Sequence, residues 1–151
     1  MNLGLKNKVA IVLASSKGLG LACARSLFEE GANVVICSRS ENNLNNAKNE
    51  IDSLESINSN NKVFPIIADL MYEDQIKNIV EKTLNEFGRI DILIHNAGEP
   101  PSGPIDKITK EDWSNSIDLN LRSFINITDL VLPIMKKQKS WTDYCNNISF
   151  C

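Results

Sequence analysis

Short runs of apolar, largely β-branched residues alternate with helical stripes along most of the chain. Four such runs, typical of strands buried on both faces of a parallel sheet, lie at 9–13 (VAIVL), 33–37 (NVVIC), 63–68 (VFPIIA) and 90–94 (IDILI). Between them, apolar residues recur every three or four positions, which predicts three helices. The first ends at Gly31, the second begins after a cap at Ser40, and the third ends at Gly88. Strands that alternate with helices over short connections predict an α/β fold with a doubly wound parallel sheet.

A fourth helix, longer than the others, is predicted to follow a turn-rich loop at 98–104. Thr109 and Asp112 have the spacing of a capping box, and the helix is expected to run to about Lys137. Such a helix must be covered on more than one side, by the sheet and by something else, because its second half is apolar nearly all round. The apolar residues there are Phe124, Ile125, Ile127, Leu130, Val131, Leu132, Ile134 and Met135.

The composition argues against several classes of protein. The formal net charge of the 151 residues is −3, with both signs interspersed, which predicts neither a nucleic-acid-binding face nor a helix that lies on a membrane. No signal peptide or membrane-spanning segment is recognised, so the cytoplasm is the expected compartment. The four cysteines lack the spacing of a metal site, and Cys23 and Cys37 fall in patterns that predict buried thiols. His95, the only histidine, has no matching partners for a proteolytic triad or a zinc site.

The turn between the first predicted strand and helix carries the clearest chemistry. It reads LASSKGLG, from Leu13 to Gly20. Backbone N–H groups in such a turn, together with the positive end of the helix dipole, can hold a pyrophosphate. Gly18 and Gly20 would let the backbone approach the ligand and let the helix pack closely on the strand. A glycine pair alone is weak evidence, and a merely structural tight turn is the alternative.

Three further segments make the chain recognisable. Asp69 follows the third predicted strand in ADL, HNAG at 95–98 follows the fourth, and Asn120 lies in DLNLRSF. With the glycine turn, these segments resemble the short-chain dehydrogenase/reductase family over residues 6 to about 139, most of all its 3-oxoacyl-acyl-carrier-protein reductases and its sugar and alcohol dehydrogenases. The family's T-G-x-x-x-G-x-G turn maps onto LASSKGLG with Ala14 in place of the first glycine, and its N-N-A-G maps onto HNAG. The resemblance implies a Rossmann-like domain over residues 1–140.

The resemblance also implies roles for individual residues. Asp69 matches the family's adenine-binding aspartate, Asn96 borders the cofactor ribose, and Asn120 matches the catalytic asparagine of a proton relay. Plain alternatives exist, because Asp69 can simply start a helix, Asn96 can bridge two strands and Asn120 can bond a backbone carbonyl. His95, which departs from the family's first asparagine, is expected to be structural. The implied cofactor-binding residues are Ala14, Ser15, Ser16, Lys17, Gly18, Leu19, Gly20, Ser38, Arg39, Asp69, Leu70, Asn96, Ala97 and Gly98.

The charges near the second predicted strand narrow the choice of cofactor. About 20 residues beyond the glycine turn, an acidic residue would bind the ribose 2′-hydroxyl, whereas a basic one accommodates a 2′-phosphate. Ser38 and Arg39 occupy that place, and Lys17 lies in the turn itself. The two cations favour NADP(H) over NAD(H), unless both are ordinary surface charges.

The proton donor that the resemblance implies is missing from the sequence. In the family, a catalytic serine and a Y-x-x-x-K motif follow the long helix, but here Tyr144 is followed four residues later by Ile148. We therefore expect the cofactor-binding part of an NADP(H)-dependent oxidoreductase, inactive alone, whose substrate is a small carbonyl or alcohol: a 3-oxoacyl thioester, a sugar or another secondary alcohol. The family's long helix helps to form the subunit interface, which implies a homodimer or homotetramer for the full-length form. A non-catalytic nucleotide-binding or interaction module is the alternative, and a methyltransferase is disfavoured because HNAG and Asn120 would then have no role.

The last residues break the pattern. Residues 140–151 (SWTDYCNNISFC) show neither a strand nor a helix period, so the sheet is expected to be incomplete, with four strands and four helices. When the reading frame moves by one nucleotide, the codons of WTDYCNN give Gly, then Pro, Leu, Gln or Arg, and then a run that can read Ile-Ile-Val-Ile-Ile. This run resembles the family's next strand. Residues 141–151 are therefore interpreted as an out-of-frame tail.

Overall fold

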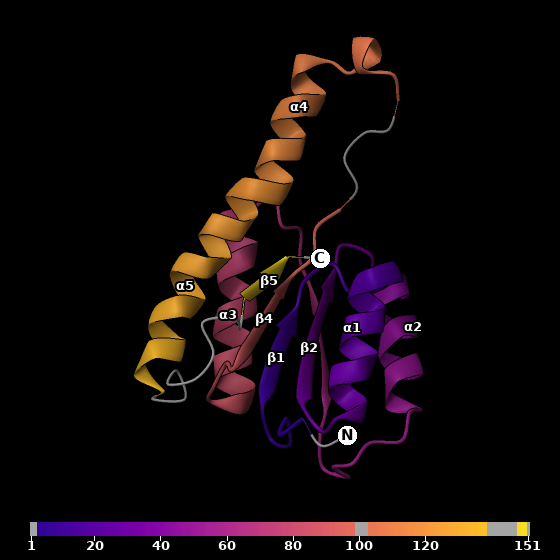
Figure 1. Ribbon diagram of the computed structural model, residues 1–151, viewed down its shortest axis with the longest axis vertical. Helices are drawn as coiled ribbons and strands as arrows, with labels where there is room; N and C mark the ends of the chain where they lie inside the picture. The colour runs from indigo at the N-terminus through magenta and orange to yellow at the C-terminus, as the bar shows by residue number, and fades with distance from the viewer. Residues whose placement is uncertain (1–2, 99–102, 139–147, 151) are drawn as a thin grey trace.

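The sheet is parallel throughout and has helices on both faces (Figure 1). The computed structural model describes residues 3–98, 103–138 and 148–150. The strand order across the sheet is β3-β2-β1-β4-β5, which confirms the predicted doubly wound α/β fold. The strands are β1 (Val9–Val12), β2 (Asn33–Ser38), β3 (Val63–Ile67), β4 (Ile92–His95) and β5 (Ile148–Phe150).

Helices form a layer on each side of the sheet. α1 (Gly18–Glu29) and α2 (Glu41–Asp52) cover one face, and α3 (Glu73–Phe87) and α5 (Ser123–Lys137) cover the other. Alternate side chains of β1 point to opposite faces, so Ile11 packs with α3 and α5 whereas Val12 packs with α1 and α2. The short helix η1 (Ile105–Lys107) precedes α4 (Lys110–Ile117), which extends past the sheet (Figure 1).

The long helix begins as predicted but is not a regular α-helix throughout. Thr109 and Asp112 form the expected capping box, with both reciprocal hydrogen bonds present. The prediction of a single α-helix as far as Lys137 is wrong in the middle of this segment. There a π turn, η2 (Asp118–Arg122), joins α4 to α5. Around this turn, Ser116, Asn120 and Ser123 each donate a side-chain hydrogen bond to the backbone carbonyl four residues earlier. Such bonds compete with the backbone ladder, which accounts for a local departure from α-helical geometry.

β5 is absent from the sequence prediction. It pairs in parallel with β4, with Leu93 opposite Ile148 and His95 opposite Phe150. The expectation that the sheet ends at the fourth strand is therefore wrong. The backbone groups along the outer edge of β4 can pair with any extended segment, whatever its side-chain period. Residues 141–147 and 151 lie outside the described residues, and the reading-frame interpretation stays a prediction.

β3 forms one edge of the sheet and carries Pro65 at its centre. The N–H of Ala68 donates to the carbonyl of Ser38 on β2 at 3.1 Å. Because backbone directions alternate along a strand, the nitrogen of Pro65 faces away from β2. The missing N–H of proline therefore costs the β2–β3 pairing no hydrogen bond.

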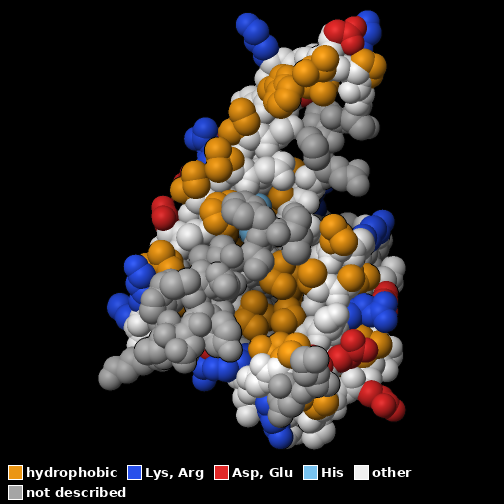
Figure 2. All heavy atoms as spheres, viewed as in Figure 1, with side chains coloured by type: hydrophobic (Ala, Val, Ile, Leu, Met, Phe, Trp, Pro, Cys, Tyr) orange, Lys and Arg blue, Asp and Glu red, His pale blue; other side chains and the backbone are white. Residues whose placement is uncertain are grey.

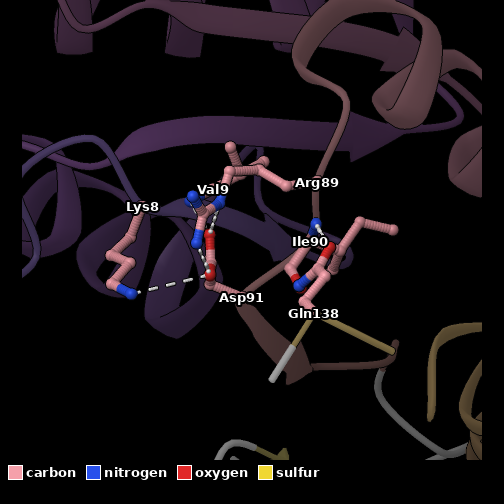
Figure 3. Close-up of polar contacts among 6 residues, drawn as sticks. All are labelled: Lys8, Val9, Arg89, Ile90, Asp91 and Gln138. Atoms are coloured by element: carbon pink, nitrogen blue, oxygen red, sulfur yellow. Dashed lines mark hydrogen bonds and ion pairs between the residues drawn. The ribbon is translucent and has the colours of Figure 1, made fainter. Parts of the chain in front are cut away.

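Just before β4, the buried carboxylate of Asp91 joins two strands (Figure 3). Its Oδ2 accepts the N–H of Val9 at 2.9 Å, and Arg89 donates to both carboxylate oxygens, at 2.8 and 2.6 Å. Beside it, Gln138 binds the backbone of Ile90 in both directions: Nε2 donates to the carbonyl at 2.6 Å, and Oε1 accepts the N–H at 2.9 Å. These contacts fix the amino ends of β1 and β4 and the end of α5 relative to one another.

Candidate functional site

The buried side chain of Ser15 hydrogen-bonds the turn between β1 and α1 to the sheet. Ser15 Oγ donates to the carbonyl of Val12 at 2.6 Å and accepts the N–H of Cys37 at 3.1 Å. The N–H of Ser15 donates in turn to the carbonyl of Cys37 at 3.0 Å. Ser15 therefore shapes the turn from inside the sheet, and its side chain does not face solvent.

The two glycines of the turn have different tasks. A Cβ on Gly20 would lie 2.7 Å from both the carbonyl oxygen of Ala14 and Nδ2 of Asn96, so only glycine fits between them. Gly18 has a φ of +55°, in the left-handed region that favours glycine, and a Cβ there would meet no atom within 4 Å. The turn is thus closed on the side of Asn96 and open at the N-terminus of α1. This arrangement fits a pyrophosphate bound by backbone N–H groups.

A cavity of about 260 Å³ lies beside the turn, at the carboxyl ends of β1, β2 and β3. Predicted site residues that line it are Ala14, Ser16, Lys17, Ser38, Arg39, Asp69, Leu70 and Gly98. The lining residues that the sequence prediction missed are Cys37, Ser40, Asn43, Ala68 and Leu119. A signal existed for Ser40 and Asn43, because they begin the helix that follows Arg39 and must lie at the same end of the sheet.

Two cations stand at this cavity. Arg39 is exposed, and neither Arg39 nor Lys17 forms an ion pair with any carboxylate of the described residues. The hydroxyl of Ser16 lies 3.0 Å from that of Ser38, and Ser38 Oγ also accepts the N–H of Ser40 at 3.3 Å. The glycine turn, the end of β2 and the start of α2 are therefore connected around a site whose charge suits an anion.

Asp69 also lines the cavity and has local contacts. Its Oδ1 accepts the N–H of Met71 at 3.0 Å, and its own N–H donates to Oε1 of Gln75 at 2.7 Å. These bonds agree with the alternative that Asp69 shapes the chain before α3. No described residue donates a hydrogen bond to Oδ2, so this oxygen can still accept one from an adenine amino group.

The remaining predicted cofactor residues surround the cavity without lining it. Gly18, Leu19 and Gly20 begin α1, with the side chain of Leu19 exposed. Asn96 and Ala97 lie half-buried directly after β4. Asn96 has a structural contact, because its Nδ2 donates to the carbonyl of Ala14 at 3.0 Å.

Asn120 lies in the π turn η2, next to a residue of the cavity. Its Nδ2 donates to the carbonyl of Ser116 at 2.9 Å, which is the backbone partner expected for a polar side chain in this helix. The preceding residue, Leu119, lines the cavity. A Cβ on Gly98 would lie 3.0 Å from Cδ2 of Leu119, so the π turn packs directly against the loop after β4.

His95 is buried at the end of β4 and contacts the long helix. Its Nε2 lies 2.9 Å from Oγ of Ser123, and its ring meets that of Phe124 edge to face, with 5.4 Å between the ring centres. Burial lowers the pKa of the imidazole below its ordinary value, although a hydrogen bond to its own backbone opposes this effect. The neutral form is therefore favoured at neutral pH.

The two described cysteines differ in burial. Cys37 is buried, as predicted, and burial raises the pKa of its thiol to about 12, so the group stays protonated and unreactive in the folded protein. Cys23 is half-buried rather than buried, because it lies at the margin of the apolar cluster between α1, α2 and the sheet. Cys145 and Cys151 lie outside the described residues.

Residues 3–98, 103–138 and 148–150 hold no group of three or more histidine, cysteine, aspartate or glutamate side chains that could bind a metal ion. No helix within these ranges has the length and apolar character needed to cross a membrane.

Known proteins share both the sequence pattern and the fold. A family model described as short chain dehydrogenase matches residues 8–141. The chain is 34% identical over 136 residues to 3-oxoacyl-[acyl-carrier-protein] reductase FabG of Thermotoga maritima, covering 90% of this chain and 53% of that protein. It is 37% identical over 134 residues to dehydrogenase/reductase SDR family member 4 of Caenorhabditis elegans, covering 88% and 50%. The chain therefore spans about half the length of the curated relatives it matches.

Solved structures give the same result. L-sorbose reductase from Gluconobacter frateurii, complexed with NADPH and L-sorbose, matches with a TM-score of 0.82 and 27% identity, over 91% of this chain and 51% of that chain. Hydroxysteroid dehydrogenase from Escherichia coli matches with a TM-score of 0.80 and 27% identity, over 89% and 52%. The fold is therefore the Rossmann-like α/β fold of these enzymes.

Proposed function

The chain belongs to the short-chain dehydrogenase family, and we propose that it is the NADP(H)-binding part of an oxidoreductase that interconverts a carbonyl and an alcohol. The observation that carries the cofactor assignment is the pair of cations at the cavity, Arg39 and Lys17, neither of which pairs with a described carboxylate. A 2′-phosphate would supply the missing negative charge, whereas a ribose 2′-hydroxyl would not. The NADPH complex of L-sorbose reductase supports the same choice by analogy.

Each part of the cavity has a task in holding this cofactor. The open side of the glycine turn and the first N–H groups of α1 would bind the pyrophosphate. Arg39 and Lys17 would bind the 2′-phosphate, and Oδ2 of Asp69 would accept a hydrogen bond from the adenine amino group. When bound, the nicotinamide supplies or accepts the hydride. Asn96 keeps the turn in shape through its bond to Ala14.

Asn120 is proposed to take part in moving the proton that accompanies the hydride. Its Nδ2 is engaged by the carbonyl of Ser116, so Oδ1 is the side-chain atom left to accept a hydrogen bond from water. The sequence holds two tyrosines, Tyr72 and Tyr144, and neither is followed four residues later by lysine. We therefore propose that this chain binds the cofactor but needs a tyrosine–lysine pair from a further segment to reduce a carbonyl.

The substrate class proposed is a small carbonyl or alcohol, such as a 3-oxoacyl thioester, a sugar or another secondary alcohol. The names of the relatives support this range, because one is a 3-oxoacyl-[acyl-carrier-protein] reductase and another was solved with L-sorbose. The cytoplasm remains the proposed compartment.

An apolar stripe on the long helix supports assembly. Figure 2 shows apolar side chains in a line along the outer edge of α4, η2 and α5. The stripe consists of Trp113, Ile117, Leu121 and Ile125, four residues apart and 47–54% exposed. Exposed apolar patches of this kind mark contact surfaces. We propose that the full-length form is a homodimer or homotetramer that buries this stripe.

The cofactor assignment is tested by reversing one charge. Arg39→Asp should weaken binding of NADPH about tenfold or more relative to NADH, because a charge-assisted bond is replaced by repulsion. Arg25→Asp is the matched control, since it makes the same charge change on α1 at a residue that does not line the cavity. Both affinities follow from the fluorescence of the bound nicotinamide.

Two outcomes would overturn the proposal. An unchanged NADPH-to-NADH ratio in Arg39→Asp would remove Arg39 from the site, and no binding of either nucleotide would leave a non-nucleotide interaction module as the better explanation. Reduction of a ketone by this chain and NADPH alone would contradict the need for a further segment.

A further inference from the structure

Two successive residues at the end of β4 reach in different directions. Asn96 donates to the carbonyl of Ala14 in the glycine turn at 3.0 Å, and Nε2 of His95 lies 2.9 Å from Oγ of Ser123 on α5. Side chains of consecutive residues along an extended segment point to opposite sides, so this divergence follows from the backbone. One strand end is therefore hydrogen-bonded both to the turn proposed to hold the pyrophosphate and to the long helix.

The hydroxyl of Ser123 links the imidazole of His95 to a backbone carbonyl in the π turn. Its single proton is donated to the carbonyl of Leu119 at 2.5 Å, so its lone pairs accept from His95, and Nε2 of the imidazole carries the hydrogen. The carbonyl of Leu119 belongs to the peptide group that joins Leu119 to Asn120. His95 thus acts, through one hydroxyl, on the peptide from which the Asn120 side chain departs.

Burial makes this connection costly to break. His95 is 3% exposed and Ser123 is 1% exposed, so neither group can exchange its partner for water. A buried donor or acceptor that loses its partner pays the full cost of desolvation. Phe124 holds the imidazole ring from a second direction through the edge-to-face contact. The ring has one well-defined orientation, as a positioning role requires.

We propose that His95 is a positioning residue for Asn120: through Ser123 it fixes the Leu119–Asn120 peptide and couples the π turn to the occupancy of the glycine turn held by Asn96. The inference rests on the proposed function, because the ligand of the glycine turn is NADP(H). Leu119 offers a second route in the same direction, since it lines the cavity and packs against Gly98. Binding of the nucleotide would then order the helix segment that carries Asn120.

Hydrogen–deuterium exchange of residues 116–124 tests the coupling in the full 151-residue chain. NADPH should slow exchange of this segment in the wild type. His95→Gln should keep the effect, because the glutamine amide can donate from about the position of Nε2 without titrating. His95→Leu and Ser123→Ala should lose most of the NADPH-dependent protection, while the NADPH dissociation constant changes by less than about threefold.

Thr83→Val is the matched control. Thr83 is fully buried on α3, and its hydroxyl donates to the carbonyl of Ile79 at 2.7 Å, so the variant removes the same kind of bond from a helix that carries neither Ser123 nor Asn120. It should leave the NADPH-dependent protection of residues 116–124 intact. Should His95→Leu fail to fold, Ser123→Ala and His95→Gln decide the question between them.

The outcomes separate this inference from the proposed function. Protection that survives in both His95→Leu and Ser123→Ala would overturn the coupling, and so would its loss in His95→Gln, which would show that ring packing alone matters. If the wild type does not bind NADPH, the proposed function and the coupling both fail. The positioning of the π turn is then judged without nucleotide: exchange of residues 116–124 must accelerate in His95→Leu and return in His95→Gln.

Discussion

The side chain of Asn96 donates a hydrogen bond to the carbonyl oxygen of Ala14 at 3.0 Å, and Ala14 has a φ of +45°. Alanine is disfavoured in this left-handed region because its Cβ approaches the following carbonyl. The bond from Asn96 and the bonds of Ser15 to β1 and β2 hold the turn in this conformation. Strain is thus retained at Ala14, in the turn between β1 and α1.

Replacing Ala14 with glycine should therefore stabilise the protein. Relief of the left-handed conformation is worth about 1 kcal/mol, and urea denaturation followed by circular dichroism measures the change. Ala10→Gly is the control, because Ala10 lies fully buried in β1, where the same substitution should cost about 1 kcal/mol. A lower free energy of unfolding in Ala14→Gly would contradict the strain.

Asp91→Asn should destabilise the protein by about 2 kcal/mol, because the buried side chain loses its charge and with it the ion pairs to Arg89 and Lys8. An asparagine oxygen in the place of Oδ2 can still accept the N–H groups of Val9 and of Arg89 Nε, so the substitution removes the negative charge and the bond from Arg89 Nη2. Glu86→Gln, which breaks the exposed pair with Lys62, should change stability by less than about 1 kcal/mol. Equal losses of stability in the two variants would show that the burial of Asp91 does not strengthen its ion pairs.

Stability should fall as the pH drops below about 6.5, the ordinary pKa of histidine, because of His95. Burial lowers the pKa of the folded imidazole below its ordinary value of 6.5, so the unfolded chain binds the proton more readily. The contribution of the neutral imidazole to the free energy of unfolding is complete above about pH 6.5, and it is lost as the pH falls toward the pKa of His95 in the folded protein. His95 is the only histidine, so His95→Gln should flatten this part of a plot of melting temperature against pH. A slope that persists in His95→Gln would assign the effect to another group.

The apolar stripe should mediate self-association. Ile117→Glu with Leu121→Glu should weaken it by about tenfold or more, because two side chains lose the burial of apolar area. Sedimentation velocity over a range of concentrations measures the change. Ile67→Glu, at a similarly exposed residue at the end of β3, should leave association unchanged. A wild-type chain that is monomeric at every concentration would contradict the role of the stripe.

The first four strands and three helices were predictable because burial on two sides of a sheet leaves a clear period in the sequence. The π turn was not, since Asp118 to Arg122 continue the helical composition and the departure depends on side-chain bonds to backbone carbonyls. β5 was missed because a three-residue strand has no period to recognise.

The candidate site was predictable where a residue belongs to a motif, as at Gly20 and Arg39. Leu119 reaches the cavity only through the placement of the π turn, which no local pattern encodes, whereas Asn43 could have been found from its place at the start of the helix after Arg39. The bond from His95 to Ser123 joins residues 28 positions apart, and only the packing of α5 against β4 reveals it.

Pro65 makes the two edges of the sheet different in their ability to pair with a further strand. Its nitrogen points outward from β3 and carries no hydrogen, so a strand arriving at that edge finds a gap in the row of donors. The opposite edge, beside β5, has no such gap among the described residues. The β3 edge is therefore less able to accept a strand from another molecule than the β5 edge, which discourages accidental polymerisation through β3.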